Sequence, residues 1–157
     1  MNLFQQLHDL CVEKEISIAT AESCTAGFLA SKITSVSGSS SFFKGGIIAY
    51  QNDIKIGYLG VLESIIREKT VVCSEVVEQM SEGVRHKFLS DFSIATSGYA
   101  GPTGGTELNP VGTVFIAISS KENTISERFI FTGDRESVIS QSVIKGVKFL
   151  MEELKNQ

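Results

Sequence analysis

The 157-residue sequence has few of the features that mark several large classes of protein. Its three cysteines, Cys11, Cys24 and Cys73, are odd in number and far apart, so neither a disulfide framework nor a metal site is predicted. We expect reduced thiols, as in a cytoplasmic protein. No apolar run approaches the roughly 20 residues that span a bilayer, so no membrane partner is expected. Residues 1–6 lack the charged and apolar regions of a signal peptide.

Basic residues and histidines are also few. The 14 Lys and Arg residues are spread along a chain of net charge −4, which indicates no nucleic-acid-binding track. His8 and His86 are both predicted at the flank or solvated face of an amphipathic helix, and this argues against a Ser–His–Asp triad. With 42% apolar residues and no repeat or linker, residues 1–157 are predicted to form one domain.

The most informative stretch is residues 16–27, I-S-I-A-T-A-E-S-C-T-A-G. A short buried strand is expected at its start and a helix over residues 24–32. Ser23, Cys24 and Thr25 are then three potential nucleophiles at a strand-to-helix turn, where free backbone N–H groups favour negative charge such as an oxyanion. The alternative is structural, because Ser and Thr are ordinary N-cap residues.

Other elements follow from hydrophobic periodicity and breakers. Their order predicts an α/β protein with helices on both faces of a mixed sheet. The helix that begins at residue 74 is expected to be capped by Ser74. The last helix is expected to be capped by Thr132 or Asp134. The expected helices cover residues 2–14, 62–68, 74–88 and 135–154, the expected strands cover residues 42–50, 92–97, 111–118 and 125–131, and residues 51–56 are expected to turn out of a strand.

Three further features can carry chemistry. Gly45 and Gly46 interrupt a strand, which marks either a close approach to a ligand or a simple twist of the sheet. The glycine-rich loop 101–105 can curl into an anion-binding nest, or can be a flexible surface loop. Lys55 can act as a base for a serine if it is desolvated. Cys24 is the rival nucleophile, and otherwise a small packed residue.

Five segments, taken together, closely resemble the CinA C-terminal domain family, which includes the stand-alone nicotinamide-nucleotide amidases. They stand in fixed order and cover nearly the whole chain. The segments are T-A-E-S-C-T-A-G (20–27), S-G-S-S-S-F-F-K-G-G-I-I-A-Y-Q-N-D-I-K (37–55), S-G-Y-A-G-P-T-G-G (97–105), P-V-G-T-V (110–114) and G-D-R (133–135).

The resemblance implies a three-layer α/β/α sandwich with a mixed sheet. It implies hydrolysis of the carboxamide of nicotinamide mononucleotide to nicotinic acid mononucleotide and ammonia, within pyridine-nucleotide recycling. By position, Ser23 would be the nucleophile and Lys55 its base, with no metal or organic cofactor. A homo-oligomer is implied, with strand 111–118 or its hairpin at the interface. The substrate-binding residues would be Thr25, Gly45, Gly46, Tyr50, Gly101, Thr103, Gly104, Gly105 and Arg135.

The chain departs from the family pattern at three places. Ala26 stands where the family usually has glycine, and Tyr99 replaces an aliphatic residue. The family often has a further arginine one turn after Arg135, where this chain has residues 138–140, V-I-S. The nest at residues 101–105 is the candidate site for the substrate phosphate, and either Arg135 substitutes for the missing arginine or the affinity for the phosphate is weaker. This departure keeps two alternatives open: a non-catalytic nucleotide-binding or regulatory module, and an amidase for another small carboxamide.

Overall fold

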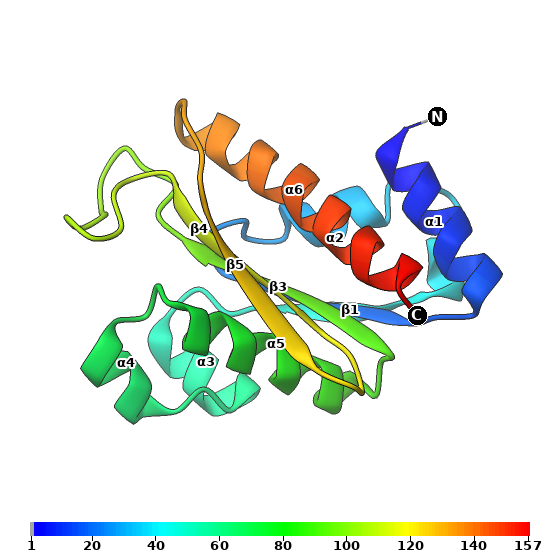
Figure 1. Ribbon diagram of the computed structural model, residues 1–157, viewed down its shortest axis with the longest axis horizontal. Helices are drawn as coiled ribbons and strands as arrows, with labels where there is room; N and C mark the ends of the chain where they lie inside the picture. The colour runs from blue at the N-terminus through cyan, green and yellow to red at the C-terminus, as the bar shows by residue number, and fades with distance from the viewer. Residues whose placement is uncertain (1) are drawn as a thin grey trace.

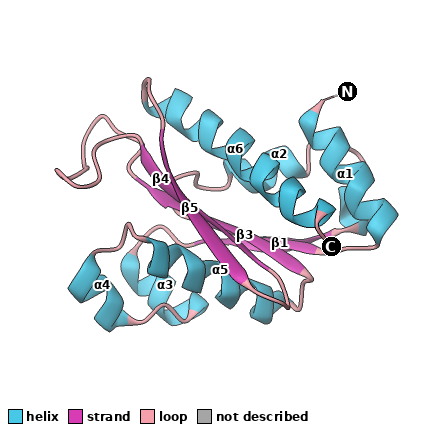
Figure 2. Ribbon diagram, viewed as in Figure 1, coloured by secondary structure: helices cyan, strands magenta, loops and turns pink. Residues whose placement is uncertain are grey.

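The computed structural model describes residues 2–157 and places one sheet between two layers of helices (Figure 1). Figure 2 shows the strands crossing the centre of the molecule, with α1, α2 and α6 over one face and α3, α4 and α5 over the other. The predicted three-layer α/β/α architecture is confirmed. The strands are β1 (Ile18–Glu22), β2 (Phe43–Ile48), β3 (Phe92–Gly98), β4 (Thr113–Ser119) and β5 (Thr124–Ile130), and the helices are α1 (Leu3–Lys14), α2 (Phe28–Ile33), α3 (Asn52–Leu59), α4 (Glu63–Lys69), α5 (Ser74–Phe88) and α6 (Arg135–Lys155).

The sheet is mixed and has the strand order β2-β1-β3-β4-β5. Strand β1 pairs in parallel with both β2 and β3, and β4 and β5 add antiparallel strands. Glu22, the last residue of β1, is in register with Ile48 of β2 and Thr96 of β3. The carboxyl ends of three strands therefore meet at one edge of the sheet. The chain leaves β1 toward α2 and leaves β2 toward α3, on opposite faces (Figure 1), which is the arrangement that opens a ligand-binding crevice in α/β sheets.

Alternate residues of the strands feed two separate cores. Ile18 and Ile94 pack with α1, α2 and α6, on what we call the α6 face. Ala19, Ala21 and Ala95 pack with α3 and α5, on what we call the α5 face. Because helices cover both faces, β1 is buried along its whole length, as in parallel sheets generally. This alternation decides which side chains reach each face at the carboxyl edge.

Three boundary predictions need correction. Residues 51–56, predicted as a turn, begin α3; its inward side is made by Lys55 and Leu59, one helical turn apart. The helix predicted over residues 24–32 starts only at Phe28, where the Glu22 carboxylate accepts from its first-turn N–H groups. Ser74 begins α5 but does not cap it, since the N-cap position is Cys73 and no side chain caps there. Asp134 does cap α6, and its carboxylate accepts from the Ser137 N–H.

Within residues 2–157, every helix is too short or too polar to cross a membrane.

Candidate active site

A small cavity of about 180 Å³ lies at the carboxyl edge of the parallel strands. Residues from five segments meet there, and three of these segments follow directly from the ends of β1, β2 and β3, the second of them running into α3. Ser23 comes from the end of β1, Tyr50 from the end of β2, and Lys55 from α3. The full lining is Ser23, Cys24, Tyr50, Asn52, Lys55, Val71, Val72, Ser97, Gly98, Tyr99, Ala100 and Arg135.

Ser23 extends β1 by one residue and turns its side chain to the cavity. Its backbone N–H donates to the Thr96 carbonyl at 3.0 Å, which continues the β1–β3 ladder. Ala21 packs on the α5 face, so the period of two brings Ser23 to that same face. Its residue exposure is 9%, and its hydroxyl has no hydrogen-bond partner in the part of the chain that the structure describes. The hydroxyl is therefore free to meet a ligand.

Lys55 is the largest of the most fully buried side chains and is only 2% exposed. Its Nζ donates to the Tyr50 carbonyl at 3.1 Å, and within residues 2–157 no carboxylate lies at ion-pair distance from it. Burial lowers the pKa of Lys55 from its ordinary value, against a smaller opposing effect of Cys24. A buried ammonium with one carbonyl partner loses its proton more readily than a solvated one. The desolvated lysine that a serine base requires is therefore present beside Ser23.

Glu22 explains why α2 starts late. Its side chain is 1% exposed, lies opposite Ser23, and reaches forward to the first turn of α2. Oε1 accepts from the Leu29 N–H at 2.9 Å and Oε2 from the Ala30 N–H at 3.0 Å. The Thr25 hydroxyl also donates to Oε1, at 2.5 Å. The carboxylate therefore satisfies the helix N-terminus from outside the helix, in place of an N-cap side chain.

This arrangement corrects the prediction that free helical N–H groups face the nucleophile. Residues 23–27 form two turns, in which the Ala26 N–H donates to the Ser23 carbonyl and the Phe28 N–H to the Thr25 carbonyl. Ala26 and Gly27 have φ angles of 47° and 96°, so neither is helical. The Glu22 carboxylate accepts from the next two backbone N–H groups, those of Leu29 and Ala30. The N–H groups of α2 are thus engaged within the protein, whereas those of Cys24 and Thr25, directly after Ser23, have no hydrogen-bond partner in residues 2–157.

Cys24, the rival nucleophile, points into the core of the α6 face and is 6% exposed. Burial raises the pKa of its thiol to about 12, with a smaller contribution from Glu22 in the same direction. The thiolate is the nucleophilic form, and at neutral pH it is present in only about one molecule in 10⁵ at such a pKa. Of the two neighbours, Ser23 is the better placed nucleophile.

Arg135, the first residue of α6, crosses the mouth of the cavity. Its Nη1 donates to the Gly101 carbonyl at 2.8 Å and its Nη2 to the Tyr50 hydroxyl at 2.9 Å. Two larger hollows, of about 440 and 370 Å³, adjoin the cavity, and Arg135 lines both. Thr25 lines the first of these and Gly101 the second. The three spaces therefore share Arg135 as a wall residue.

Gly45 and Gly46 do not reach the cavity, although both were expected to approach a ligand. A side chain at Gly46 would meet the Thr20 hydroxyl at 2.1 Å, and one at Gly45 would meet the Phe88 ring at 3.1 Å. These glycines let β2 lie close to β1 and α5. They are explained by packing, which is the structural alternative to ligand binding.

The loop 101–105 lies beside the cavity but only its start contributes to the site. Ala100 lines the cavity and Gly101 holds Arg135, whereas Thr103 and Gly104 are exposed and Gly105 is half-buried. In Figure 1 the connection between β3 and β4 projects from the end of the sheet. The structure thus brings Ser23, Lys55, Tyr50 and Arg135 together and leaves Thr103, Gly104 and Gly105 outside the cavity lining.

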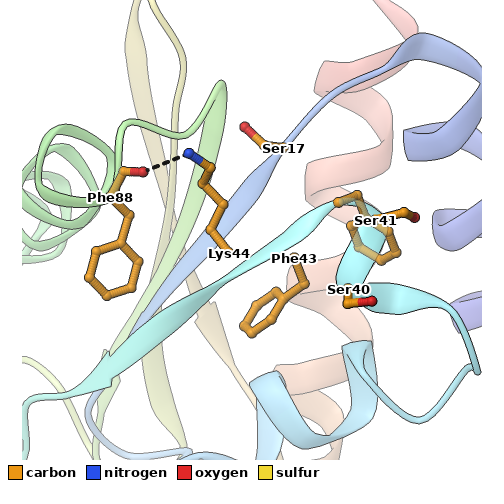
Figure 3. Close-up of a pocket in the computed structure, with 7 residues that line it drawn as sticks. Ser17, Ser40, Ser41, Phe43, Lys44 and Phe88 are labelled. Atoms are coloured by element: carbon orange, nitrogen blue, oxygen red, sulfur yellow. Dashed lines mark hydrogen bonds between the residues drawn. The ribbon is translucent and has the colours of Figure 1, made fainter.

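A separate hollow of about 520 Å³, larger than the cavity at Ser23, lies where β2 begins. Figure 3 shows Lys44 directed across it to the Phe88 carbonyl, to which its Nζ donates at 3.1 Å. Ser17, Ser40, Ser41 and two phenylalanines make up most of the remaining wall. None of the predicted site residues lines it, and the Lys44 ammonium faces carbonyl groups. Its size alone does not make it the reactive site.

Sequence reasoning missed Ser97, Asn52 and Tyr99 as cavity residues. Ser97 is the most informative of them, because it follows Thr96, the register partner of Glu22. A prediction that β1 and β3 are adjacent parallel strands would have placed it beside Ser23. No three His, Cys, Asp or Glu side chains of residues 2–157 gather where they could hold a metal ion.

These features define a three-layer α/β/α protein with a serine and a buried lysine at the carboxyl edge of its parallel strands. The chain belongs to the CinA family: residues 1–154 match the CinA C-terminal domain. It is 45% identical over 148 residues to a CinA-like protein of Flavobacterium psychrophilum, covering 94% of this chain and 35% of that protein. With a CinA-like protein of Shewanella pealeana it shares 42% identity over 154 residues, 98% of this chain and 36% of that one. The chain thus spans about a third of the length of these relatives.

Solved structures of the family have the same fold. A CinA superfamily protein from Klebsiella pneumoniae 700603 superposes with a TM-score of 0.94 at 30% identity, covering 100% of both chains. The competence/damage inducible protein CihA from Agrobacterium tumefaciens gives 0.91 at 28% identity, covering 100% of this chain and 98% of its own. Family membership and fold, both expected from the sequence motifs, are therefore confirmed.

Proposed function

We propose that the protein hydrolyses the carboxamide of nicotinamide mononucleotide to nicotinic acid mononucleotide and ammonia. The observation that carries this proposal is the sharing of one small cavity by Ser23, with its hydroxyl free, and Lys55, with its ammonium buried and its pKa lowered. A serine activated by an unprotonated lysine can attack an amide without histidine. The particular substrate comes from the resemblance to the amidases of the CinA family.

The reaction can be written with the residues of the cavity. The Ser23 Oγ attacks the carboxamide carbon and its proton passes to the Lys55 Nζ, giving a tetrahedral oxyanion. The carbon–nitrogen bond then breaks, and the departing nitrogen takes the proton from Lys55 and leaves as ammonia. Water, deprotonated by the same lysine, then attacks the ester carbon of the acyl-enzyme. The ester bond to the Ser23 Oγ breaks, the Oγ takes back a proton from Lys55, and the acid is released.

The dimensions of the site support a ligand with a small reactive head. A cavity of about 180 Å³ is below the roughly 300–1,000 Å³ of sites that hold a whole drug-sized ligand. The carboxamide ring would enter it, while the rest of the nucleotide would occupy the hollows joined at Arg135. The guanidinium donates one N–H group to the Gly101 carbonyl and one to the Tyr50 hydroxyl, which leaves three of its five N–H groups to pair with a phosphate there.

Ammonia release from nicotinamide mononucleotide by the purified chain tests the proposal. We expect stoichiometric formation of nicotinic acid mononucleotide, detected by chromatography, and none with Ser23→Ala. Thr103→Ala, in the exposed part of the loop, is the control and should keep the wild-type rate. Release from a different small carboxamide, with none from the nucleotide, would reject this substrate but retain the amidase class.

A second function is favoured by one specific observation. Lys55 Nζ bonds to the Tyr50 carbonyl, while the Ser23 hydroxyl has no partner among residues 2–157, so no bond joins the two. A non-catalytic nucleotide-binding module would have the same pocket without that bond. Catalytic hydrogen bonds of free enzymes are often made only when substrate binds. Calorimetric binding of the nucleotide without ammonia release would establish this second function.

A further inference from the structure

Ser97 is buried in the cavity wall without a structural bond. Its residue exposure is 1%, yet it lines the same space as Ser23 and Lys55. Its hydroxyl has no hydrogen-bond partner within the described residues 2–157, and it is not among the buried polar atoms closed off from solvent. A buried serine hydroxyl ordinarily bonds to nearby backbone or side chains. The Ser97 hydroxyl is thus available to a molecule that enters the cavity.

The register of the sheet places Ser97 next to Ser23. Glu22 pairs with Thr96 in parallel strands, and the Ser23 N–H continues that ladder to the Thr96 carbonyl. The following residues, Ser23 and Ser97, therefore lie on neighbouring strands, roughly 5 Å apart along the hydrogen-bonding direction. Ser93, four residues before Ser97 on the same side of β3, bonds to Ser81 of α5. Both cavity serines consequently face α5.

Attack by Ser23 creates a negative oxygen that needs a donor close by. The Leu29 and Ala30 N–H groups are taken by Glu22 and those of Ala26 and Phe28 by the turns, whereas the Cys24 and Thr25 N–H groups, directly after Ser23, have no partner in residues 2–157 and can share the oxyanion with a side-chain donor. Lys55 is required as the base. Of the side chains beside Ser23 in the cavity, Ser97 offers a free O–H group.

We propose that Ser97 is a further catalytic residue, whose hydroxyl donates a hydrogen bond to the oxyanion formed when Ser23 attacks an amide. This role rests on the proposed amidase function but not on the identity of the substrate. The Ser97 hydroxyl would donate to the carboxamide oxygen of any substrate whose carbonyl carbon lies within reach of the Ser23 Oγ. No proton is transferred by Ser97, so the charge balance of the reaction is unchanged.

Ser97→Ala tests this role, with Ser93→Ala as the matched control. We expect Ser97→Ala to lower kcat for nicotinamide mononucleotide about 10²- to 10³-fold, the usual cost of one oxyanion donor, with KM changed less than about threefold. The pH at which kcat rises should not move, because Lys55 is untouched. Ser93→Ala removes a bonded hydroxyl from the same strand and face and should leave kcat within about twofold.

Thermal unfolding separates a catalytic role from a structural one. Since the Ser97 hydroxyl has no partner to lose, Ser97→Ala should unfold within about 2 °C of the wild type or above it. The near-isosteric Ser97→Cys, a weak donor, should also be folded and slow. A folded Ala or Cys variant with wild-type kcat, a moved pH profile, or a Ser97→Ala protein that unfolds well below wild type would each overturn the assignment.

Labelling by a small alkyl fluorophosphonate keeps this test independent of the substrate. The Ser23 Oγ forms a bond to phosphorus, fluoride leaves with the electrons of the broken P–F bond, and the proton goes to Lys55. Intact-protein mass spectrometry should show labelling at least tenfold slower in Ser97→Ala than in Ser93→Ala. Labelling without nucleotide hydrolysis in the wild type would reject the proposed substrate alone. Wild-type protein that is neither labelled nor active would reject both proposals.

Discussion

Replacing Lys55 by methionine should abolish turnover and stabilise the fold at neutral pH. Methionine keeps the apolar length of the side chain and removes the ammonium. In the wild type Lys55 is 2% exposed as a residue, and within residues 2–157 its ammonium has one carbonyl partner and no ion-pair partner. The effective penalty for burying a charge is several kcal/mol, and one hydrogen bond to a charged group offsets about 1.5–3 kcal/mol of it.

The net gain for Lys55→Met is then about 2 kcal/mol in the free energy of unfolding, by analogy with other buried charges replaced by apolar residues of similar volume. For a domain of this size it corresponds to a rise of roughly 4–8 °C in Tm. Urea unfolding followed by circular dichroism measures it, with the exposed Lys148→Met as control. The control should change the unfolding free energy by less than about 0.5 kcal/mol.

The gain should also depend on pH, with a sign fixed by the lowered pKa of Lys55. Between that lowered value and about 10.4, the pKa of a free lysine, the unfolded chain binds more protons than the folded one. Wild-type stability therefore rises with pH across this window, relative to Lys55→Met. The advantage of the variant should shrink as pH approaches 10. A variant less stable than wild type at pH 7, or an advantage that is constant with pH, would refute this account of the buried ammonium.

Five other substitutions follow from the site. Lys55→Arg should lower kcat at least about 100-fold, because a guanidinium does not release its proton near neutral pH; an active variant with an unchanged kcat–pH profile would exclude the general base. Ser23→Ala should abolish ammonia release with an unchanged circular dichroism spectrum, whereas Cys24→Ala should retain most of it, and the reverse result would identify Cys24 as the nucleophile. Glu22→Gln should cost about 1–3 kcal/mol in urea unfolding, since an amide has one acceptor oxygen where two now accept; an unchanged urea midpoint would contradict its capping role. Ala26→Gly should raise the free energy of unfolding in urea slightly, by about 0.5 kcal/mol, because alanine at φ 47° costs about 1–2 kcal/mol and glycine loses part of this in backbone entropy; a lower free energy of unfolding would show that no strain is relieved.

The sequence was sufficient to predict the layers, most elements and the meeting of Ser23 with Lys55. Periodicity marked the helices and strands, and the ordered motifs identified the family and hence the fold. The start of α2 was missed because Glu22 caps it from seven and eight residues away. Capping patterns in a sequence extend over only about three residues, so such a contact is visible only in three dimensions.

The glycines show a different limit. Gly45 and Gly46 were predicted to approach a ligand. Glycine within a strand indicates only that another group packs closely against the backbone, and it does not show whether that group is a ligand or part of the protein. Which neighbour it is depends on the pairing of β2 with β1 and on the packing of α5, and here the neighbours are Thr20 and Phe88. Ser97 was missed for the same reason, since its position beside Ser23 follows from strand register and not from spacing along the chain.

The register of β1 and β3 separates the structural from the chemical side chains of the site. Glu22 and Thr96 are partners on the α6 face, where the Thr25 hydroxyl connects them with bonds of 2.5 and 2.8 Å. The next residue of each strand, Ser23 or Ser97, turns to the cavity on the α5 face. A shift of either strand by one residue would exchange the two sets. The buried Glu22 network therefore fixes the phase of the turn that presents Ser23, and changes in that network should act first on stability, whereas changes at the two serines should act first on turnover.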